Sequence, residues 1–273
     1  MTSQVTDMMD KISRGARLES AEEMTAEYRD DLVHLMTMQA DSELAGGYGY
    51  VAWITKAPTV EEKHVVAQIV KDELRHATVM YGLLADLGVD VDRHVREHDE
   101  TFTMRIGADA DIGTARITSD KRVNIFYYPI DTWTDFVFFN FCMDRGAGHQ
   151  LEDVRQCSYG PWARTIEGIF KEEKFHIRHG EYWVKRLAED PATHDEAQRT
   201  FERWYIRTMN IFGRPGSPRN QRYRRFRLKS RDNDVVRQAF ATEIAGLCEK
   251  FGLTVPQWKP RWDRLPEEGQ IPG

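Results

Sequence analysis

The sequence predicts an all-α protein built around four long helices. Apolar residues recur at steps of three and four over four long stretches, the spacing of one helix face. Turn and capping residues separate these stretches. The chain has 273 residues, 41% hydrophobic and 30% charged, enough to bury a core. We expect a flexible segment over residues 1–21, a helical domain over 22–252 with its four-helix core at 22–188, and an extended C-terminal tail over 253–273.

The first two helices are predicted over residues 22–54 and 59–87. Ala57 and Pro58 end the first, and Thr59 with Glu62 matches a capping box that starts the second. Gly88 follows, where a helix commonly ends in a left-handed residue. Residues 89–130 carry turn residues and short β-branched stretches, which predict a loop or a small hairpin.

The later helices are marked by similar signals. Asp131 or Thr132 should cap a third helix that reaches about residue 156, and Pro161 should open a fourth that ends near residue 188. A fifth helix is predicted over 194–212 and a sixth over 234–251. Residues 213–220 read as loop, and a basic run follows over 219–231.

Composition excludes several classes of function. The net charge of −6 argues against general nucleic-acid binding. No run approaches eighteen apolar residues, and the charged N-terminal residues lack the apolar stretch of a signal peptide, so we expect no membrane span and no secretion. Three cysteines without a CxxC pair, Cys142, Cys157 and Cys248, indicate reduced thiols and a cytoplasmic setting.

Two of the four helices carry a carboxylate and an imidazole on their apolar face. Glu73 and His76 interrupt the stripe of the second helix, and Glu173 and His176 interrupt that of the fourth. Residues three apart share one face of a helix, so each pair points inward. Burying carboxylates costs free energy unless another charge compensates them.

The other two helices each supply an inward carboxylate. Glu43 lies on the stripe of the first helix and precedes Glu73 by 30 residues, and Asp144 lies on the stripe of the third and precedes Glu173 by 29. The four helices therefore read as two similar hairpins, each with one carboxylate and one Glu-x-x-His. This is the ligand pattern of ferritin-like bundles that hold two metal ions.

We therefore predict a dinuclear metal site and a ferritin-like bundle. The predicted ligands are Glu43, Glu73, His76, Asp144, Glu173 and His176. Four carboxylates and two imidazoles suit iron, or manganese, whereas zinc more often takes fewer carboxylates. Asp72 and Glu172 precede ligand glutamates; each could accept a hydrogen bond from the opposite helix's histidine, or be a partly solvated helix charge.

At these residues the sequence resembles a known family. The motifs WITKAP (53–58), SYGPWAR (158–164) and KEEKFH (171–176) resemble, in the same order, the catalytic A subunits of the ring-1,2-phenylacetyl-CoA epoxidases of phenylacetic acid catabolism. The resemblance covers about residues 28–189 and is weaker beyond them. The family's ligand pattern carries over onto the six residues predicted above. Arg75 stands between two of them, where the family more often has a small residue.

The resemblance implies a di-iron monooxygenase that delivers one oxygen atom of O2 to the aromatic ring of an acyl-CoA. It implies electrons from NAD(P)H through a separate flavin and iron–sulfur reductase, a small accessory subunit, and a sister subunit that is ferritin-like but metal-free. Two other functions stay open: a di-iron N-oxygenase or hydroxylase with another substrate, and a ferroxidase-type iron-binding protein. A metal-free scaffold is disfavoured by the complete ligand set.

Three further features of the sequence can each be interpreted in more than one way. Gly46 and Gly47 follow Glu43 and serve either to leave space for O2 or substrate beside the metal, or to allow close helix packing or a kink. The aromatic stripe of the third helix either lines a substrate pocket or belongs to the core; it comprises Phe136, Phe138, Phe139 and Phe141. The basic run, with Arg222, Arg224 and Arg225, either contacts CoA phosphates or a partner protein, or is a solvated loop.

Overall fold

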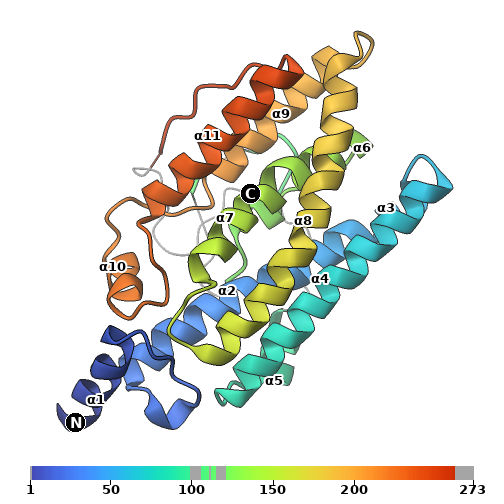
Figure 1. The fold of residues 1–273 in the computed structure, drawn as a ribbon. Helices are drawn as coiled ribbons and strands as arrows, with labels where there is room; N and C mark the ends of the chain where they lie inside the picture. Colours follow the sequence, from blue (N-terminus) through green and yellow to red (C-terminus); the bar gives the residue numbers. More distant parts are fainter. Residues whose placement is uncertain (1, 99–105, 111, 115–120, 262–273) are drawn as a thin grey trace.

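Four long helical segments form a bundle, and the remaining helices pack around it (Figure 1). The computed structural model describes residues 2–98, 106–110, 112–114 and 121–261. The bundle consists of α2 (Ala26–Val51), α4 (Val60–Asp86), α8 (Gly160–Glu189) and a composite third segment. The described ranges contain no β-strand, only an isolated bridge between Leu18 and Tyr159. The predicted all-α, ferritin-like fold is confirmed.

Capping residues start the first two bundle helices as predicted. The Thr25 hydroxyl accepts the Tyr28 N–H at the start of α2, and the Thr59 hydroxyl accepts the Glu62 N–H at the start of α4. The Glu62 side chain turns to His179 instead of closing the capping box. Gly88 follows α4 with a φ of 78°, a left-handed conformation that glycine adopts without a Cβ clash. A short helix, α3 (Trp53–Lys56), joins α2 to α4.

The third bundle segment is not one continuous α-helix. It begins at α6 (Trp133–Phe139) with a full capping box between Thr132 and Asp135, continues as the π-helical η4 (Asn140–Asp144) and ends as α7 (Arg145–Val154). The sequence predicted an uninterrupted helix. The π-helical turn holds one extra residue, a feature that often marks functional sites, and it contains Asp144.

The C-terminal helices cover the outer face of the third segment. In Figure 1, α9 (His194–Met209) and α11 (Asn233–Phe251) lie beside α6 and α7, opposite α4. Helix α10 (Pro218–Arg225), which Ser217 caps by accepting the Asn220 N–H, begins within the predicted loop over 213–220 and includes the first part of the basic run. Helix α9 ends at Met209, short of the predicted residue 212.

The predicted flexible segment 1–21 is corrected by the structure. Residues Thr2–Ser13 form α1, and its Met8 and Ile12 side chains are buried in the core. Leu18 is also buried and exchanges backbone hydrogen bonds with residues 158 and 160. Buried apolar residues four apart offset the entropy of ordering this polar segment, which composition alone did not reveal.

Other connections are partly described. Within the predicted loop over 89–130, the structure has α5 (Val91–His98) and the 3-10 turn η3 (Asn124–Tyr127), and a second such turn, η1 (Ala21–Glu23), precedes α2. Residues 99–105, 111 and 115–120 lie outside the described residues. The tail has no regular structure over 252–261, and its end is not described. Among the described helices, none is long and apolar enough to cross a membrane.

Candidate metal centre

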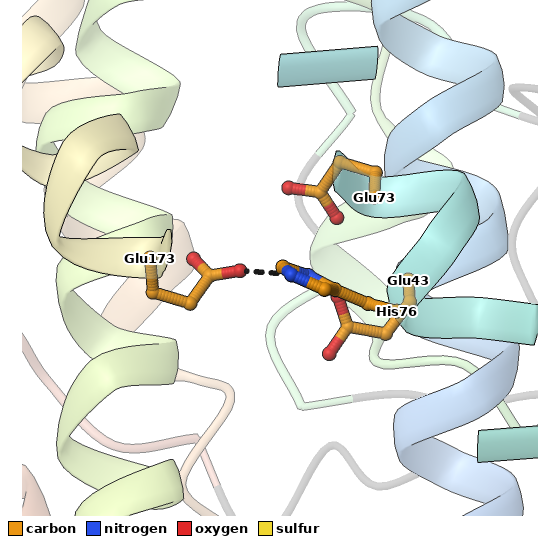
Figure 2. A group of neighbouring side chains, drawn as sticks. All are labelled: Glu43, Glu73, His76 and Glu173. Carbon is orange, nitrogen blue, oxygen red and sulfur yellow. Dashed lines mark hydrogen bonds and ion pairs between the residues drawn. The ribbon is translucent and has the colours of Figure 1, made fainter. Parts of the chain in front are cut away.

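Four of the six predicted ligands form one tight cluster between α2, α4 and α8 (Figure 2). Glu43 comes from α2, Glu73 and His76 from α4, and Glu173 from α8. Each offers one ligand atom, and these atoms lie within 4.8 Å of one another. His76 Nδ1 lies 3.3 Å from Glu43 Oε2 and 3.2 Å from Glu173 Oε1. Carboxylates from two other helices thus flank one imidazole nitrogen of α4.

The remaining two predicted ligands lie beside this cluster. His176 Nδ1 is 3.3 Å from Glu73 Oε1 and 3.5 Å from Glu173 Oε2. Asp144 lines the same cavity as Glu43, Glu73 and Glu173, and it accepts hydrogen bonds from the Tyr50 hydroxyl at 3.2 Å and from Asn140 Nδ2 at 2.9 Å. All six predicted residues therefore belong to one region of the bundle.

The two histidines face the acidic residues of the opposite Glu-x-x-His helix. His76 Nε2 lies 2.8 Å from Glu172 Oε2, and His176 Nε2 lies 3.6 Å from Asp72 Oδ2. In both rings Nδ1 faces the ligand carboxylates and Nε2 faces away from them. Asp72 and Glu172 thus stand where acids that orient ligand histidines stand in metal sites. Their role stays a prediction.

Arg75, the residue without a sequence explanation, pairs with Glu172 across the α4–α8 contact. The same Glu172 oxygen, Oε2, also faces His76 Nε2. Arg75 itself is 42% exposed at its side chain, so it sits at the rim and not on the ligand face. Arg75 therefore contacts Glu172 rather than the predicted metal ligands.

The buried carboxylates and imidazoles of this region strongly shift one another's pKa values. Burial and the nearby Glu173 carboxylate raise the pKa of Glu73 well above its usual range and that of Asp144 to about 8. Burial by itself lowers the pKa of His76, but contacts with Glu173 and Glu43 outweigh it and raise that pKa to about 10. These shifts show that the buried carboxylate cluster favours positive charge nearby, from protons or from cations.

The donor set fits divalent metal ions. Both ring nitrogens of His176 are buried and make no hydrogen bond in the described residues, although carboxylates lie within 3.6 Å. A buried nitrogen without a hydrogen bond is costly unless something binds it. The four carboxylates carry four negative charges, which two divalent ions would balance. Oxygen and imidazole donors without thiolate suit iron or manganese.

Sequence reasoning missed the residues that support the ligands. Gln39 Nε2 donates to Glu43 Oε1 at 3.1 Å, and Trp162 Nε1 donates to Gln39 Oε1 at 3.0 Å. On the third segment, Asn140 holds Asp144 in the same way. The available signal was an amide four residues before each carboxylate, one helical turn away.

A cavity of about 110 Å³ opens onto the ligands. Its lining is mainly apolar and comes from α2, η4, α7 and α8, with additions from Glu73 of α4 and from residues 123, 126 and 229. The lining residues are Leu35, Met38, Gln39, Ser42, Glu43, Tyr50, Glu73, Val123, Phe126, Met143, Asp144, Ala147, Gln150, Leu151, Val154, Trp162, Glu173 and Lys229. An apolar cavity with a few convergent polar groups is the usual form of a small-molecule site.

The phenylalanines of the third segment belong to the core. All four are buried, and none lines the cavity. Phe136 packs edge-on against Tyr50, with ring centroids 5.2 Å apart, and Phe139 against Trp204 at 5.1 Å. Tyr50, Phe126 and Trp162 contribute the aromatic rings of the cavity instead.

The two glycines after Glu43 serve close packing. A Cβ on Gly47 would lie 2.8 Å from Leu74 Cδ2 of α4, and one on Gly46 would lie 3.1 Å from Glu73 Oε2 and 3.4 Å from the Phe126 ring. Gly46 therefore also makes room for a ligand carboxylate. The contacts favour close packing at both positions, and space for O2 or substrate beside the metal stays a prediction.

The predicted anion-binding arginines face carboxylates of this chain. Arg222 makes two hydrogen bonds of 2.9 Å to Asp31, and Arg225 Nη2 lies 2.7 Å from Glu27 Oε2. Arg224 Nη2 is 3.8 Å from Asp232 Oδ2. These ion pairs fasten α10 to α2 and to the start of α11. A contact with CoA or a partner stays a prediction.

A four-helix bundle with carboxylates and imidazoles gathered between its helices defines a ferritin-like helical protein with a candidate metal centre. The family model described as phenylacetic acid catabolic protein matches residues 8–270, and the chain belongs to this family. The chain is 28% identical to the A subunit of 1,2-phenylacetyl-CoA epoxidase from Escherichia coli (strain K12) over 249 residues, 90% of this chain and 75% of that protein. It is 28% identical to benzoyl-CoA oxygenase component B of Aromatoleum evansii over 61% of this chain, which covers 33% of that protein.

Proposed function

We propose that this chain is the catalytic di-iron subunit of a multicomponent monooxygenase that inserts one atom of O2 into the aromatic ring of an acyl-CoA, with 1,2-epoxidation of phenylacetyl-CoA as its reaction. The observation that carries the proposal is the buried set of carboxylates and imidazoles at a largely apolar cavity. The two oxygenase relatives, both named for acyl-CoA substrates, support the reaction class.

In this proposal Glu43, Glu73, His76, Asp144, Glu173 and His176 hold two iron ions, with manganese as the alternative metal. Iron, when bound, supplies the activation of O2. Asp72 and Glu172 orient the histidines, and Tyr50 with Asn140 orients Asp144. The apolar lining excludes water and places the aromatic ring beside the metal ligands.

The remaining components follow from the same reaction. Inserting one oxygen atom and reducing the other to water requires two electrons, which we assign to NAD(P)H through a separate flavin and iron–sulfur reductase. The proposed assembly is completed by a small accessory subunit together with a ferritin-like sister subunit that holds no metal. Both relatives are named as parts of larger enzymes, which supports a multicomponent system.

Metal analysis combined with an oxygenase assay tests the proposal. The chain, loaded anaerobically with Fe²⁺ and supplied with reductase and sister subunit, should hold two iron ions and convert phenylacetyl-CoA only when O2 is present. Glu73→Gln and Glu173→Gln should each lower turnover by at least about 100-fold. Removing a residue that only orients a metal ligand lowers activity about 10–100-fold, and removing the ligand itself should cost more. Glu167→Gln, an exposed change on α8, is the matched control.

Three outcomes would contradict the proposal in different ways. A wild-type chain that binds no iron would refute the metal centre. Iron oxidation without turnover of any CoA thioester would indicate a ferroxidase. Turnover of a substrate that is not a thioester would indicate a hydroxylase or N-oxygenase, whereas a preference for benzoyl-CoA over phenylacetyl-CoA would revise only the acyl group.

A further inference from the structure

A buried lysine lies at the end of the cavity that is remote from the ligands. The lining follows α2 from Glu43 back to Leu35, and the third bundle segment from Asp144 at the end of η4 to Val154 at the end of α7. At 1.5 Å per helical residue, these stretches span about 12 and about 15 Å. Lys229 lines the cavity and pairs with Asp153, the neighbour of Val154. Its side chain therefore belongs to the remote end.

The Lys229 ammonium group has no hydrogen-bond acceptor among the contacts of the described residues, although its side chain is buried. Its side chain is 7% exposed, and Asp153 Oδ2, its ion-pair partner, lies 3.7 Å from Nζ, beyond hydrogen-bond distance. An ammonium group has three N–H donors, and burying it without acceptors costs free energy. Burial lowers the pKa of Lys229, and the Asp153 charge opposes this effect.

Asp153 faces Lys229 with Oδ2, which is buried and makes no hydrogen bond within the described part of the chain, while its other oxygen binds elsewhere. Its Oδ1 accepts hydrogen bonds from the Ser230 N–H at 3.1 Å and the Arg231 N–H at 2.9 Å. These bonds already fasten the segment after α10 to α7. Arg231 also compensates the Asp153 charge, with Nε 3.2 Å from Oδ1. Pairing with Asp153 thus leaves the N–H donors of Lys229 without an acceptor among the described residues and does not explain the place of Lys229 on the cavity wall.

We infer that Lys229 is a specificity residue that donates a hydrogen bond to an amide carbonyl of the CoA arm when the acyl group occupies the ligand end of the cavity. This inference rests on the proposed acyl-CoA function. The arm of CoA carries its first amide a few bonds beyond the thioester sulfur, so the acyl group and this part of the arm together have a length comparable with the distance from the predicted ligands to Lys229. Gln150, also on the lining between the two ends, adds a second polar group along this route.

Substrates that differ only in the arm test the inference. The iron-loaded full-length chain is titrated anaerobically, without reductant, with phenylacetyl-CoA, its N-acetylcysteamine thioester and its S-ethyl thioester, which lacks the amide. Lys229→Met should weaken binding of the first two about tenfold, the effect of one hydrogen bond to a charged group. Binding of the S-ethyl thioester should stay within twofold. Lys185→Met, an exposed change on α8, should alter none of the three.

Kinetics and stability complete the test. In the coupled assay, Lys229→Met should raise KM for phenylacetyl-CoA about tenfold and leave kcat within twofold, with unchanged iron content and melting temperature. Equal weakening of all three thioesters, or a lower melting temperature that accounts for the loss, would reduce Lys229 to a structural role. Unchanged binding of all three would overturn the inference alone, whereas a wild-type chain that binds none of them would overturn the proposed function as well.

Discussion

Single side chains support the candidate metal centre through one recurring local contact. Three amides each donate to a carboxylate four residues later: Gln39 to Glu43 at 3.1 Å, Gln68 to Asp72 at 2.7 Å and Asn140 to Asp144 at 2.9 Å. Residues four apart are neighbours on a helix surface, so each amide can restrict the carboxylate without help from another helix. Two of these acids are predicted ligands, and the third faces a ligand histidine.

Glu172 provides the sharpest test at the residue scale. Glu172→Ala should weaken iron binding by about 10–100-fold, because His76 loses the acid that orients its ring. Glu172→Gln, which keeps an acceptor oxygen, should show a smaller loss. Competition with a chelator measures both affinities.

The control for this prediction lies on the same helix. Glu167→Ala removes an exposed glutamate that pairs with Arg155 and faces no histidine, so iron affinity should not change. Equal iron affinity of Glu172→Ala and the wild-type chain would show that Glu172 does not position His76.

At the scale of elements, the π-helical turn and its partner helix are fitted to each other. A Cβ on Gly180 of α8 would lie 2.5 Å from the Phe141 nitrogen and 2.8 Å from the Asn140 carbonyl carbon, both in η4. These are backbone atoms, so they cannot turn away as a side chain can. Glycine at this position therefore sets how closely α8 approaches the turn that carries Asp144.

Two alanine substitutions on α8 test this contact. Gly180→Ala should destabilise the protein by about 1–3 kcal/mol through overpacking. Gly168→Ala, whose Cβ would meet nothing within 4 Å, should stabilise it by about 0.5–1 kcal/mol because alanine favours a helix. Denaturant unfolding measures both. A neutral Gly180→Ala would mean that η4 yields to the added methyl group.

At the scale of the whole molecule, the helices at both ends of the chain are fastened to the bundle. Arg227 Nη1 donates to the Ile12 carbonyl oxygen at 2.9 Å, which joins the end of α1 to the segment after α10. Arg145 of α7 pairs with Glu243 of α11 and with Glu181 of α8. The third bundle segment is thereby enclosed between α8 and α11.

The N-terminal helix should contribute measurably to stability. Ile12→Ala should lower the free energy of unfolding by about 2–5 kcal/mol, the usual effect of truncating a buried isoleucine. Val5→Ala, on the same helix but 47% exposed, should change it by less than about 0.5 kcal/mol. If the two variants unfold alike, α1 does not pack on the core in solution.

The junction of α7 and α11 should show a defined pH dependence. A hydrogen bond from His149, aided by the Arg145 charge, lowers the pKa of Glu243 to about 2. A lowered pKa means that the carboxylate stabilises the fold above its ordinary pKa of about 4.5 and loses this effect as the pH falls towards 2. Glu243→Gln should therefore cost about 0.5–1 kcal/mol at pH 7, a small value because the side chain is 43% exposed.

Unfolding free energies of the two chains across pH test this prediction. The difference between wild type and Glu243→Gln should be constant above pH 5 and should shrink as the pH falls below 4. A difference that is independent of pH over this range would mean that the ion pair does not form in solution.

The sequence by itself determined the features that depend on neighbours in the chain. Capping residues and helical periodicity predicted the long bundle helices, and the Glu-x-x-His spacing placed Glu73 with His76 and Glu173 with His176 on single helix faces. Helix geometry is repeated every turn, so local spacing suffices for such predictions. The π-helical turn was not predicted, because one inserted residue leaves the periodic pattern of apolar residues almost unchanged.

Only the tertiary structure decided what lies across helices. The contact of Arg75 with Glu172, the position of Lys229 on the cavity wall and the burial of α1 join residues that are far apart in sequence. Such contacts depend on how closely helices approach and on which rotamers fill the space between them. Spacing along one helix contains no information about either. The positions of the predicted ligands along their helices therefore followed from the sequence, whereas the residues that surround them did not.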